Sequence, residues 1–505
     1  MTAFASLVAV SAAVSGTSSR LAKVRALADF LGSLDAGEVA IALPYLSGDT
    51  RQGKLSVGFA TLQSARISPS AEPALAIGDV DTAFDRLKIV KGKGSTGQRT
   101  ALLRELFARA TAEEQDFLVR LLVGELRQGA LEGIMVEAVA AAAGLPPADV
   151  RRAAAFAGAI APVAVAALTR RALSEFSIRL MQPVLPMLAQ PAEDIHAALE
   201  ALGTALVEWK LDGARVQVHK AGDEVRVYTR NLNDVTARVP EIVAVVQAAS
   251  AKELILDGEA IALRADRRPH PFPVTMSRFG SQQGADLELS VFFFDCLYRD
   301  GESLFDHPTR ERRSALESAL PAELATPAIV TRDAAEAERF YQAALAAGHE
   351  GVMAKALDIP YEAGRRGAGW LKVKRARTLD LVVLAAEWGH GRRKGWLSNL
   401  HLGARDPRTG GFVMLGKTFK GMTDALLAWQ TEELQKRVIH RDDWVVHVRP
   451  ELVVEIAFND LQESSQYPGG LALRFARVKG YRPDKRPEEA DTIDTVRQIY
   501  QESIA

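Results

Sequence analysis

The chain is poor in the residues that stabilise small or metal-bound folds. Among 505 residues there is one cysteine, Cys296, which excludes a disulfide framework, and no paired Cys/His spacing predicts a structural zinc site. No apolar run is long enough to predict a transmembrane helix. The formal net charge is −1, which argues against a uniformly basic nucleic-acid-binding protein. We therefore expect a globular protein of the cytoplasm, a reducing compartment, with no membrane partner.

The apolar start of the chain, Met1–Gly16, is predicted to belong to the fold rather than to a signal peptide. It lacks a basic leading region, and Phe4, Leu7 and Val8 fall at helical spacing. Thr17–Ser19 is typical of an N-cap and predicts a second helix over Arg20–Phe30.

Three successive segments with different secondary-structure patterns predict a multidomain protein. Residues 1–180 carry helical periodicity and predict an all-α domain, and prolines between residues 183 and 191 then break that pattern. Residues 181–376 alternate strand-like runs with helical patches such as Arg310–Leu320, which predicts an α+β domain. Residues 377–505 contain short strands and one evident helix, Asp424–Val438, which favours a small β-barrel, with the OB-fold as the first candidate.

One segment is much more basic than the chain as a whole. Tyr361–Lys420 contains 13 Lys or Arg and 4 Asp or Glu, interleaved with Trp370, Trp388 and Trp396. Clustered positive charge with aromatic side chains suits phosphate backbones. The alternative is a set of solvated side chains that folding disperses, but we expect a polyanion-binding surface here.

Two short patterns imitate nucleotide-binding loops. Gly92–Gly97 matches G-x-G-x-x-G, but its helical surroundings exclude a dinucleotide site, which needs a βαβ unit. That loop could still offer backbone N–H groups and Lys93 to a phosphate, or it could be a plain turn. Gly411–Thr418 matches the Walker A pattern, but the four residues between its glycines are apolar and predict a strand, so the match is fortuitous.

The strongest candidate for chemistry is Glu208–Arg215, which reads EWKLDGAR. It places Lys210 between two carboxylates and an arginine, with strand-like residues on both sides. A lysine fixed on rigid β-structure suits covalent catalysis through an amine. Taken alone, the stretch is more typical of an exposed hairpin whose charges are solvated.

Further polar patches follow Lys210 along the chain, each at the predicted end of a strand or in a turn. In order they are Tyr228–Asn231, Leu256–Glu259, Phe292–Asp295, His349–Lys355, Trp370–Lys374, Arg474–Arg477 and Arg482–Lys485. The ordered set resembles the nucleotidyltransferase motifs of ATP-dependent DNA ligases, from a K-x-D-G-x-R element onward. The N-terminal helical region, notably Gly124–Gly129, resembles the DNA-binding domain of the larger members of that family.

The resemblance implies the role of each candidate site residue. Lys210 would attack the α-phosphate of ATP and carry AMP, Glu208 would contact the adenine amino group, and Phe294 would stack on the adenine ring. Lys372 and Lys374 alternate with apolar residues, so both are expected on one face of their strand, against the α-phosphate. Neighbouring cations and a bound metal are expected to lower the pKa of Lys210. The remaining implied contacts are Arg215, Arg230 and Arg366 to the nucleotide or the nick phosphate, and Glu259 and Glu350 to ribose or Mg²⁺.

The family also implies a mobile C-terminal barrel. Arg474, Arg477, Asp484 and Lys485 match the element that reaches the pyrophosphate in the first step, although Ala476 stands where the family often has proline. We expect a hinge near Arg377–Asp380, where the texture changes.

The resemblance implies an enzyme that seals 3′-OH/5′-phosphate nicks in duplex DNA during replication, repair or recombination. A monomer that encircles DNA is expected. The alternatives are an RNA ligase or GTP-using capping enzyme, which share the lysine motif, and a catalytically silent nucleic-acid-binding protein.

Overall fold

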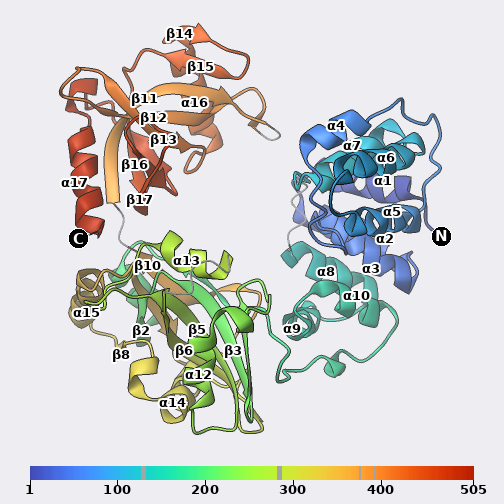
Figure 1. Ribbon diagram of the computed structural model, residues 1–505, viewed down its shortest axis with the longest axis horizontal. Coiled ribbons are helices and arrows are strands. Elements are labelled where there is room, and N and C mark those ends of the chain that lie inside the picture. Colours follow the sequence, from blue (N-terminus) through green and yellow to red (C-terminus); the bar gives the residue numbers. More distant parts are fainter. Residues whose placement is uncertain (127–131, 281–286, 375–376, 391–392, 505) are drawn as a thin grey trace.

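The computed structural model describes residues 1–126, 132–280, 287–374, 377–390 and 393–504. Three regions follow one another along the chain (Figure 1). A helical region contains the N-terminus, a central region contains two sheets, and a strand-rich region contains the C-terminus.

The N-terminal region is helical, as the sequence predicts. Phe4, Leu7, Tyr45, Phe84 and Phe117 are fully buried in its core. The expected cap of the second helix is present, since the Ser19 side chain accepts a hydrogen bond from the backbone N–H of Ala22. The helices are α1 Phe4–Ser15, α2 Arg20–Gly32, α3 Ala36–Ser47, α4 Phe59–Ala65, α5 Ile77–Ile89, α6 Ser95–Ala108, α7 Ala112–Leu122, α8 Glu132–Ala143, α9 Pro147–Ala157 and α10 Ile160–Leu168.

Neither of the two glycine patterns, Gly92–Gly97 and Gly411–Thr418, has the secondary structure that a nucleotide-binding loop requires. Gly92 and Gly94 have positive φ in the loop between α5 and α6, with no strand before it, so a dinucleotide-binding unit is excluded there. The Walker-like segment is strand β13, Phe412–Thr418, paired antiparallel with its neighbour. Part of the Gly124–Gly129 stretch lies outside the described residues.

The central region contains two five-stranded sheets. The first has the order β1-β10-β9-β2-β8 and the second the order β4-β3-β5-β6-β7. The first comprises β1 Leu188–Pro191, β2 Ala205–Lys210, β8 Ala328–Thr331, β9 Gly351–Ala356 and β10 Arg366–Lys374. The second comprises β3 Ala214–Ala221, β4 Glu224–Thr229, β5 Glu253–Ala262, β6 Leu289–Arg299 and β7 Glu302–Ser303.

Helices of the central region cover these sheets. Residues of α11 and α15 share a core with β2, β9 and β10, and residues of α12 and α14 share a core with the second sheet. These helices are α11 Ile195–Leu202, α12 Pro240–Gln247, α13 Phe272–Gly280, α14 Thr309–Ala319 and α15 Ala334–Ala346.

The segment around Lys210 is not a hairpin. Strand β2 ends at Lys210 in the first sheet, and strand β3 begins at Ala214 in the second, so the chain crosses between sheets within three residues. Gly213 permits this crossing, because a Cβ there would lie 2.3 Å from the carbonyl oxygen of Ala260. The solvated-hairpin alternative is thereby excluded.

The C-terminal region is rich in strands, and its pairing is consistent with the predicted OB-type barrel. The sheet runs β13-β12-β11-β15-β14, and β16 pairs with both β11 and β19. Its elements are β11 Arg377–Trp388, β12 Leu397–Arg405, β13, α16 Asp424–Gln435, β14 Val438–Arg441, β15 Val445–Val448, β16 Val453–Phe458, β17 Asp460–Glu463, β18 Leu471–Arg474, β19 Arg477–Tyr481 and α17 Ile493–Ile504.

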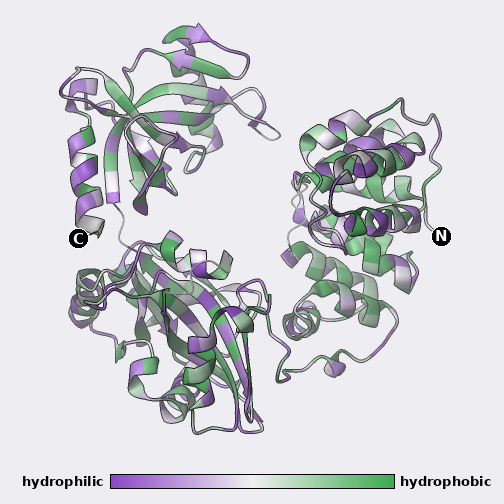
Figure 2. Cartoon of the chain, in the orientation of Figure 1, coloured by the Kyte–Doolittle hydropathy of each residue, from purple (hydrophilic) through white to green (hydrophobic). Residues whose placement is uncertain are grey.

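Two expectations for this region need correction. Helix α17 is a second helix that the sequence analysis missed; its hydrophilic and hydrophobic positions alternate in Figure 2, and Ile493 and Val496 are buried against the strands. The expected hinge at Arg377–Asp380 lies inside β11, where these residues pair with Phe458 to Glu455 of β16. Strand β10 ends at Lys374, so the connection consists of residues 375 and 376, which lie outside the described part.

Side-chain contacts join the three regions. Helix α9 contacts the central region through the Arg152–Asp306 ion pair and through Phe156, whose ring lies 4.6 Å from that of Phe305. The C-terminal region contacts the central region where the Arg474 guanidinium lies 5.1 Å from the ring of Phe272.

No single helix in the described residues is both long and apolar enough to span a membrane. The helices α8 and α9 meet the length and composition criteria only together, with a 119° bend between them.

Candidate active site

A cavity of about 970 Å³ opens at the seam between the two central sheets. The crossing segment from Glu208 to Arg215 lines one side, and β18 of the C-terminal region contributes Arg474. Of the predicted site residues, the cavity is lined by Glu208, Lys210, Arg215, Arg230, Glu259, Phe294, Glu350, Lys372, Lys374 and Arg474.

Lys210 is paired with a carboxylate. Its Nζ lies 2.5 Å from Oε2 of Glu350, and the other oxygen of Glu350 accepts a hydrogen bond from Lys374 Nζ at 2.7 Å. Burial would lower the pKa of Lys210, but Glu350, Glu259 and Asp212 together outweigh burial and raise it. The protein groups around Lys210 therefore raise its pKa rather than lower it, because the sequence does not reveal how many carboxylates converge on this lysine. The part of the expectation that depends on a bound metal stays a prediction.

Two of those carboxyl groups titrate near neutrality. Burial raises the pKa of Glu259 to about 7, although Lys210, Arg215 and the Gly213 N–H oppose the shift. Burial and the charge of Glu350 raise the pKa of Asp212 to about 6. Burial therefore disfavours full ionisation of the carboxyl groups around Lys210.

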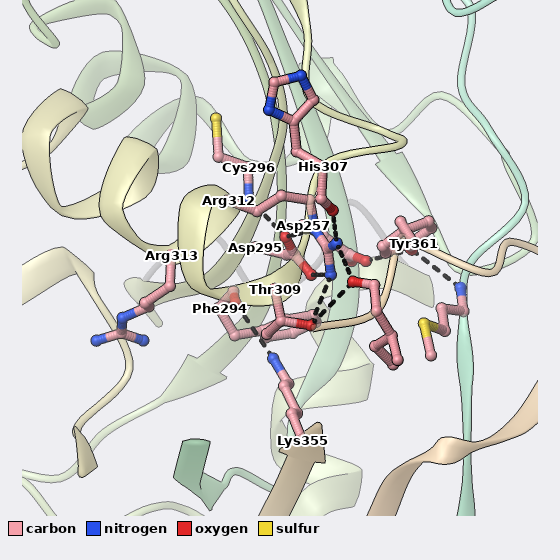
Figure 3. Close-up of polar contacts among 12 residues, drawn as sticks. Asp257, Phe294, Asp295, Cys296, His307, Thr309, Arg312, Arg313, Lys355 and Tyr361 are labelled. Atoms are coloured by element: carbon pink, nitrogen blue, oxygen red, sulfur yellow. Dashed lines mark hydrogen bonds and ion pairs between the residues drawn. The ribbon is translucent and has the colours of Figure 1, made fainter. Parts of the chain in front are cut away.

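The far end of the cavity is built around Glu208. This carboxylate is 1% exposed, and it pairs with Lys355 Nζ at 2.5 Å and with Arg313 Nη1 at 3.1 Å. Lys355 also donates to the backbone carbonyl of Phe294 at 3.2 Å, and its Nζ lies 4.7 Å from the centroid of the Phe294 ring (Figure 3). Phe294 and Trp370 meet edge to face at 6.1 Å, which leaves Phe294 as an aromatic wall of the cavity.

Arg215 is already occupied by protein partners. Its Nε and Nη2 donate to the two oxygens of Asp257, and its Nη1 donates to the carbonyl oxygen of Met187 at 2.6 Å. Tyr361 completes the group, because its hydroxyl donates to Asp257 at 2.6 Å. In this state Arg215 fixes β3 to neighbouring segments, and the expected fork towards a phosphate is not available.

The structure does not bring every predicted residue to the cavity. Lys485 pairs with Asp380 of β11, and Asp484 pairs with Arg482, so this C-terminal element is held within its own region. Arg477 begins β19 and is exposed. The side chain of Arg366 lies outside the described residues.

The carboxylates present fit a partly hydrated magnesium ion rather than a cage made by the protein. In the described part of the chain, no group of three or more His, Cys, Asp or Glu residues is placed to hold a metal. Mg²⁺ is commonly bound through one or two carboxylates together with waters and substrate phosphates. Glu259 and Glu350 both line the cavity and supply that kind of donor.

Several residues of the site were not predicted. Asp212 lies in the motif Glu208–Arg215 and Lys355 in the motif His349–Lys355, so the sequence could have indicated both as site residues. Arg313 lies in an ordinary charged helix, and the partnership of Asp257 with Tyr361 spans 104 positions. Only the folded chain brings those residues together.

Comparison with known proteins decides the family. The chain matches the model for the ATP dependent DNA ligase domain over residues 186–374, with the corresponding C terminal region at 393–485 and the DNA ligase N terminus at 52–140. It is 58% identical over 511 residues to a protein named Probable DNA ligase from Anaeromyxobacter sp. (strain Fw109-5), covering 99% of this chain and 98% of that one. The chain belongs to the family of ATP-dependent DNA ligases.

Further similarities agree with this family and its fold. A protein named DNA ligase B from Mycobacterium tuberculosis (strain CDC 1551 / Oshkosh) is 55% identical, over 96% of this chain and 98% of its own length. The solved structure titled Pmar-Lig_PreS3 has a TM-score of 0.63 at 19% identity and covers 94% of this chain and 99% of that one. The helical, adenylation and strand-rich regions of this ligase thus correspond to a shared fold, and the predicted fold class is confirmed.

Proposed function

We propose that this ligase seals 3′-OH/5′-phosphate nicks in duplex DNA through a lysyl-AMP intermediate on Lys210. The observation that carries the proposal is the position of Lys210, which lies in the cavity at the seam between two sheets and is flanked by Glu350 at 2.5 Å. The buried lysines of the described chain have other partners, since Lys355 pairs with Glu208 and Lys220 donates to the carbonyl oxygens of Gln247 and Ala249.

The first step would form a bond between Lys210 Nζ and the α-phosphorus of ATP, while the bond to pyrophosphate breaks. An amine attacks only without its proton, so Lys210 must first give up the ammonium form that Glu350 stabilises. Asp212 has a pKa raised to about 6 and is suited to accept a proton near neutral pH. Lys372 and Lys374 from β10 would stabilise the charge that develops on the phosphate.

The other end of the cavity suits the adenine base. Glu208 would accept from the 6-amino group and Phe294 would stack on the ring. Arg230 lines the cavity and would contact the nucleotide or the nick. Arg215 would reach a phosphate only after it exchanges its hydrogen bonds to Asp257. For Arg366, the family resemblance implies a contact to the nucleotide or the nick phosphate.

Magnesium is the metal we propose for this chemistry. Glu259 and Glu350 would hold it, and when bound it would neutralise phosphate charge that develops during transfer.

The second and third steps would transfer AMP to the 5′-phosphate of the nick and then release it as the phosphodiester bond forms. We assign residues 1–180 to DNA binding, 181–376 to adenylation and 377–505 to the OB-type domain. Arg474, Arg477, Asp484 and Lys485 would approach the pyrophosphate when the C-terminal domain closes. A monomer that encircles DNA, acting in the cytoplasm in replication, repair or recombination, fits this arrangement.

The proposal is tested with α-labelled ATP and magnesium. We expect an acid-labile label on the protein, its loss in Lys210→Ala, and its transfer to nicked DNA with recovery of sealed product. A label from GTP in preference to ATP, or transfer to nicked RNA alone, would favour a related nucleotidyltransferase. An undiminished label in Lys210→Ala would refute the proposed nucleophile.

A further inference from the structure

The base end of the cavity contains a buried hydroxyl group without a partner. Thr326 lines the cavity and is 1% exposed, and its Oγ1 has no hydrogen-bond partner among the described residues. A buried hydroxyl without a partner normally destabilises a fold, and native structures contain few of them. Such a group at a ligand site is an obvious candidate for a ligand contact.

The backbone of Thr326 is fixed next to the residues that frame the base. Its N–H donates to the carbonyl oxygen of Phe293 at 2.8 Å, which places Thr326 beside the strand that presents Phe294. Its own carbonyl oxygen accepts from Arg313 Nη2 at 3.0 Å.

Arg313 links Thr326 to Glu208. The second nitrogen of the same guanidinium, Nη1, donates to Glu208 Oε1 at 3.1 Å. Because a guanidinium is planar and rigid, its two nitrogens set the carbonyl of Thr326 and the carboxylate of Glu208 next to each other. Figure 3 shows Arg313 on α14 and the neighbouring Phe294 and Lys355.

We propose, on the basis of the proposed function, that Thr326 is a second residue that recognises the adenine base. Its hydroxyl donates to the ring nitrogen N1, while Glu208 accepts from the 6-amino group. The pair would match the two adjacent groups on the edge of adenine, an acceptor and a donor. Guanine presents a carbonyl oxygen in place of the amino group, and this oxygen would face the carboxylate of Glu208.

The first test replaces the hydroxyl without changing the shape of the side chain. Protein freed of AMP with pyrophosphate is titrated with ATP, and the half-saturating concentration for lysyl-AMP formation is measured. In Thr326→Val we expect this concentration to rise about tenfold, as for loss of one hydrogen bond. The melting temperature of the ligand-free variant should not fall, because no protein hydrogen bond is removed.

Thr309 provides a matched control. It is also buried, at 2% exposed, but its hydroxyl donates to the carbonyl oxygen of Ile359 at 3.4 Å and accepts from Arg312 Nη2 at 3.3 Å. Thr309→Val should therefore lower the melting temperature and leave the half-saturating ATP concentration unchanged. The two variants thus separate a ligand contact from a contribution to folding.

The second test removes the group on the ligand. With 1-deaza-ATP, which lacks N1, the unmodified protein should show about the same tenfold weakening, and Thr326→Val should show no further loss. Additive losses would overturn the proposal, as would an unchanged ATP requirement in Thr326→Val. In either of these two cases Lys210 would still form labelled lysyl-AMP. If the proposed function were wrong, no lysyl-AMP would form at all.

Discussion

At the residue scale, Lys210, the proposed nucleophile, is paired with the carboxylate of Glu350, although Lys372 and Lys374 line the same cavity. Glu350, Glu259 and Asp212 together raise the pKa of Lys210. The pKa values of Glu259 and Asp212 are also raised, because burial disfavours their charged forms. We infer that binding of a nucleotide and its cation redistributes these protons, and that the ligand-free site is electrostatically costly above neutral pH.

Replacement of Glu259 with glutamine tests that cost. The pKa of Glu259 is about 7 in the folded protein, against about 4.3 for a free glutamate. The folded protein therefore binds a proton between these values that the unfolded chain does not, and its stability falls as the pH rises through that window. In Glu259→Gln this loss is absent, so we expect a higher melting temperature of the ligand-free protein at pH 8, and little difference at pH 4.5.

Calorimetry at several pH values checks this expectation for the transition of the central region. Glu224→Gln, at an exposed position of β4, is the control and should show no comparable dependence on pH. A stabilisation by Glu259→Gln that grows towards acid pH would contradict the assignment.

At the element scale, the site depends on close approach of strand ends. Gly351 starts β9 directly after Glu350, with φ +142°, and a Cβ there would lie 2.2 Å from the carbonyl oxygen of Val373 in β10. Strand β10 carries Lys372 and Lys374. The glycine therefore lets the strand that follows Glu350 lie against the strand that carries the two lysines.

Substitution of this glycine should be severe. We expect Gly351→Ala to destabilise the central region by more than about 3 kcal/mol, because strain and a backbone clash act together. Gly222→Ala is the control, since Gly222 has φ +60° but, apart from its two chain neighbours, no described residue lies within 4 Å of its Cβ position. Its cost should be about 1 kcal/mol. Chemical denaturation of both variants measures the two losses of stability. Equal losses would show that the close approach of β9 to β10 does not determine the effect of Gly351→Ala.

Much of this arrangement could be predicted from the sequence, and the reasons for the rest are physical. Local patterns identified Lys210, the strand ends around it and the helical N-terminal region. The separation of β2 and β3 into different sheets could not be predicted, because alternation of side chains describes a strand but not its partner. The carboxylate that occupies Arg215 and the helix that positions Glu208 are long-range contacts. Helix α17 was missed although Ile493, Val496 and Ile499 recur at helical spacing; only the fold shows that they pack against the strands of the C-terminal region.

At the scale of the whole molecule, the C-terminal region is only partly engaged with the site. Arg474 reaches the cavity, while Lys485 and Arg482 are retained by Asp380. The proposed three-step reaction would need this region both near the nucleotide and away from it. We expect the C-terminal region to turn relative to the central region at the junction between β10 and β11.

A reversible crosslink tests whether that rotation is needed. Met276 of α13 and Asn459 of the C-terminal region line the same cavity from opposite regions. The only native cysteine, Cys296, is buried, and burial raises its pKa to about 12, so it should not compete for reagent. In the double variant Met276→Cys/Asn459→Cys, a flexible cleavable linker should spare lysyl-AMP formation and block nick sealing.

Cleavage of the linker should restore sealing, and each single-cysteine variant treated with the same reagent should seal normally. Sealing that persists at full rate in the linked protein would refute the need for rotation.

The ion pair between Lys210 and Glu350 has a consequence for the chemistry of the resting protein. A lysine kept as an ammonium does not react with aldehydes, cyanate or acyl donors, all of which require the free amine. The raised pKa thus lowers the fraction of Lys210, the proposed nucleophile, that is present as the free amine and open to small electrophiles. Its reactivity is conditional on its substrate, which preserves the enzyme between encounters with ATP.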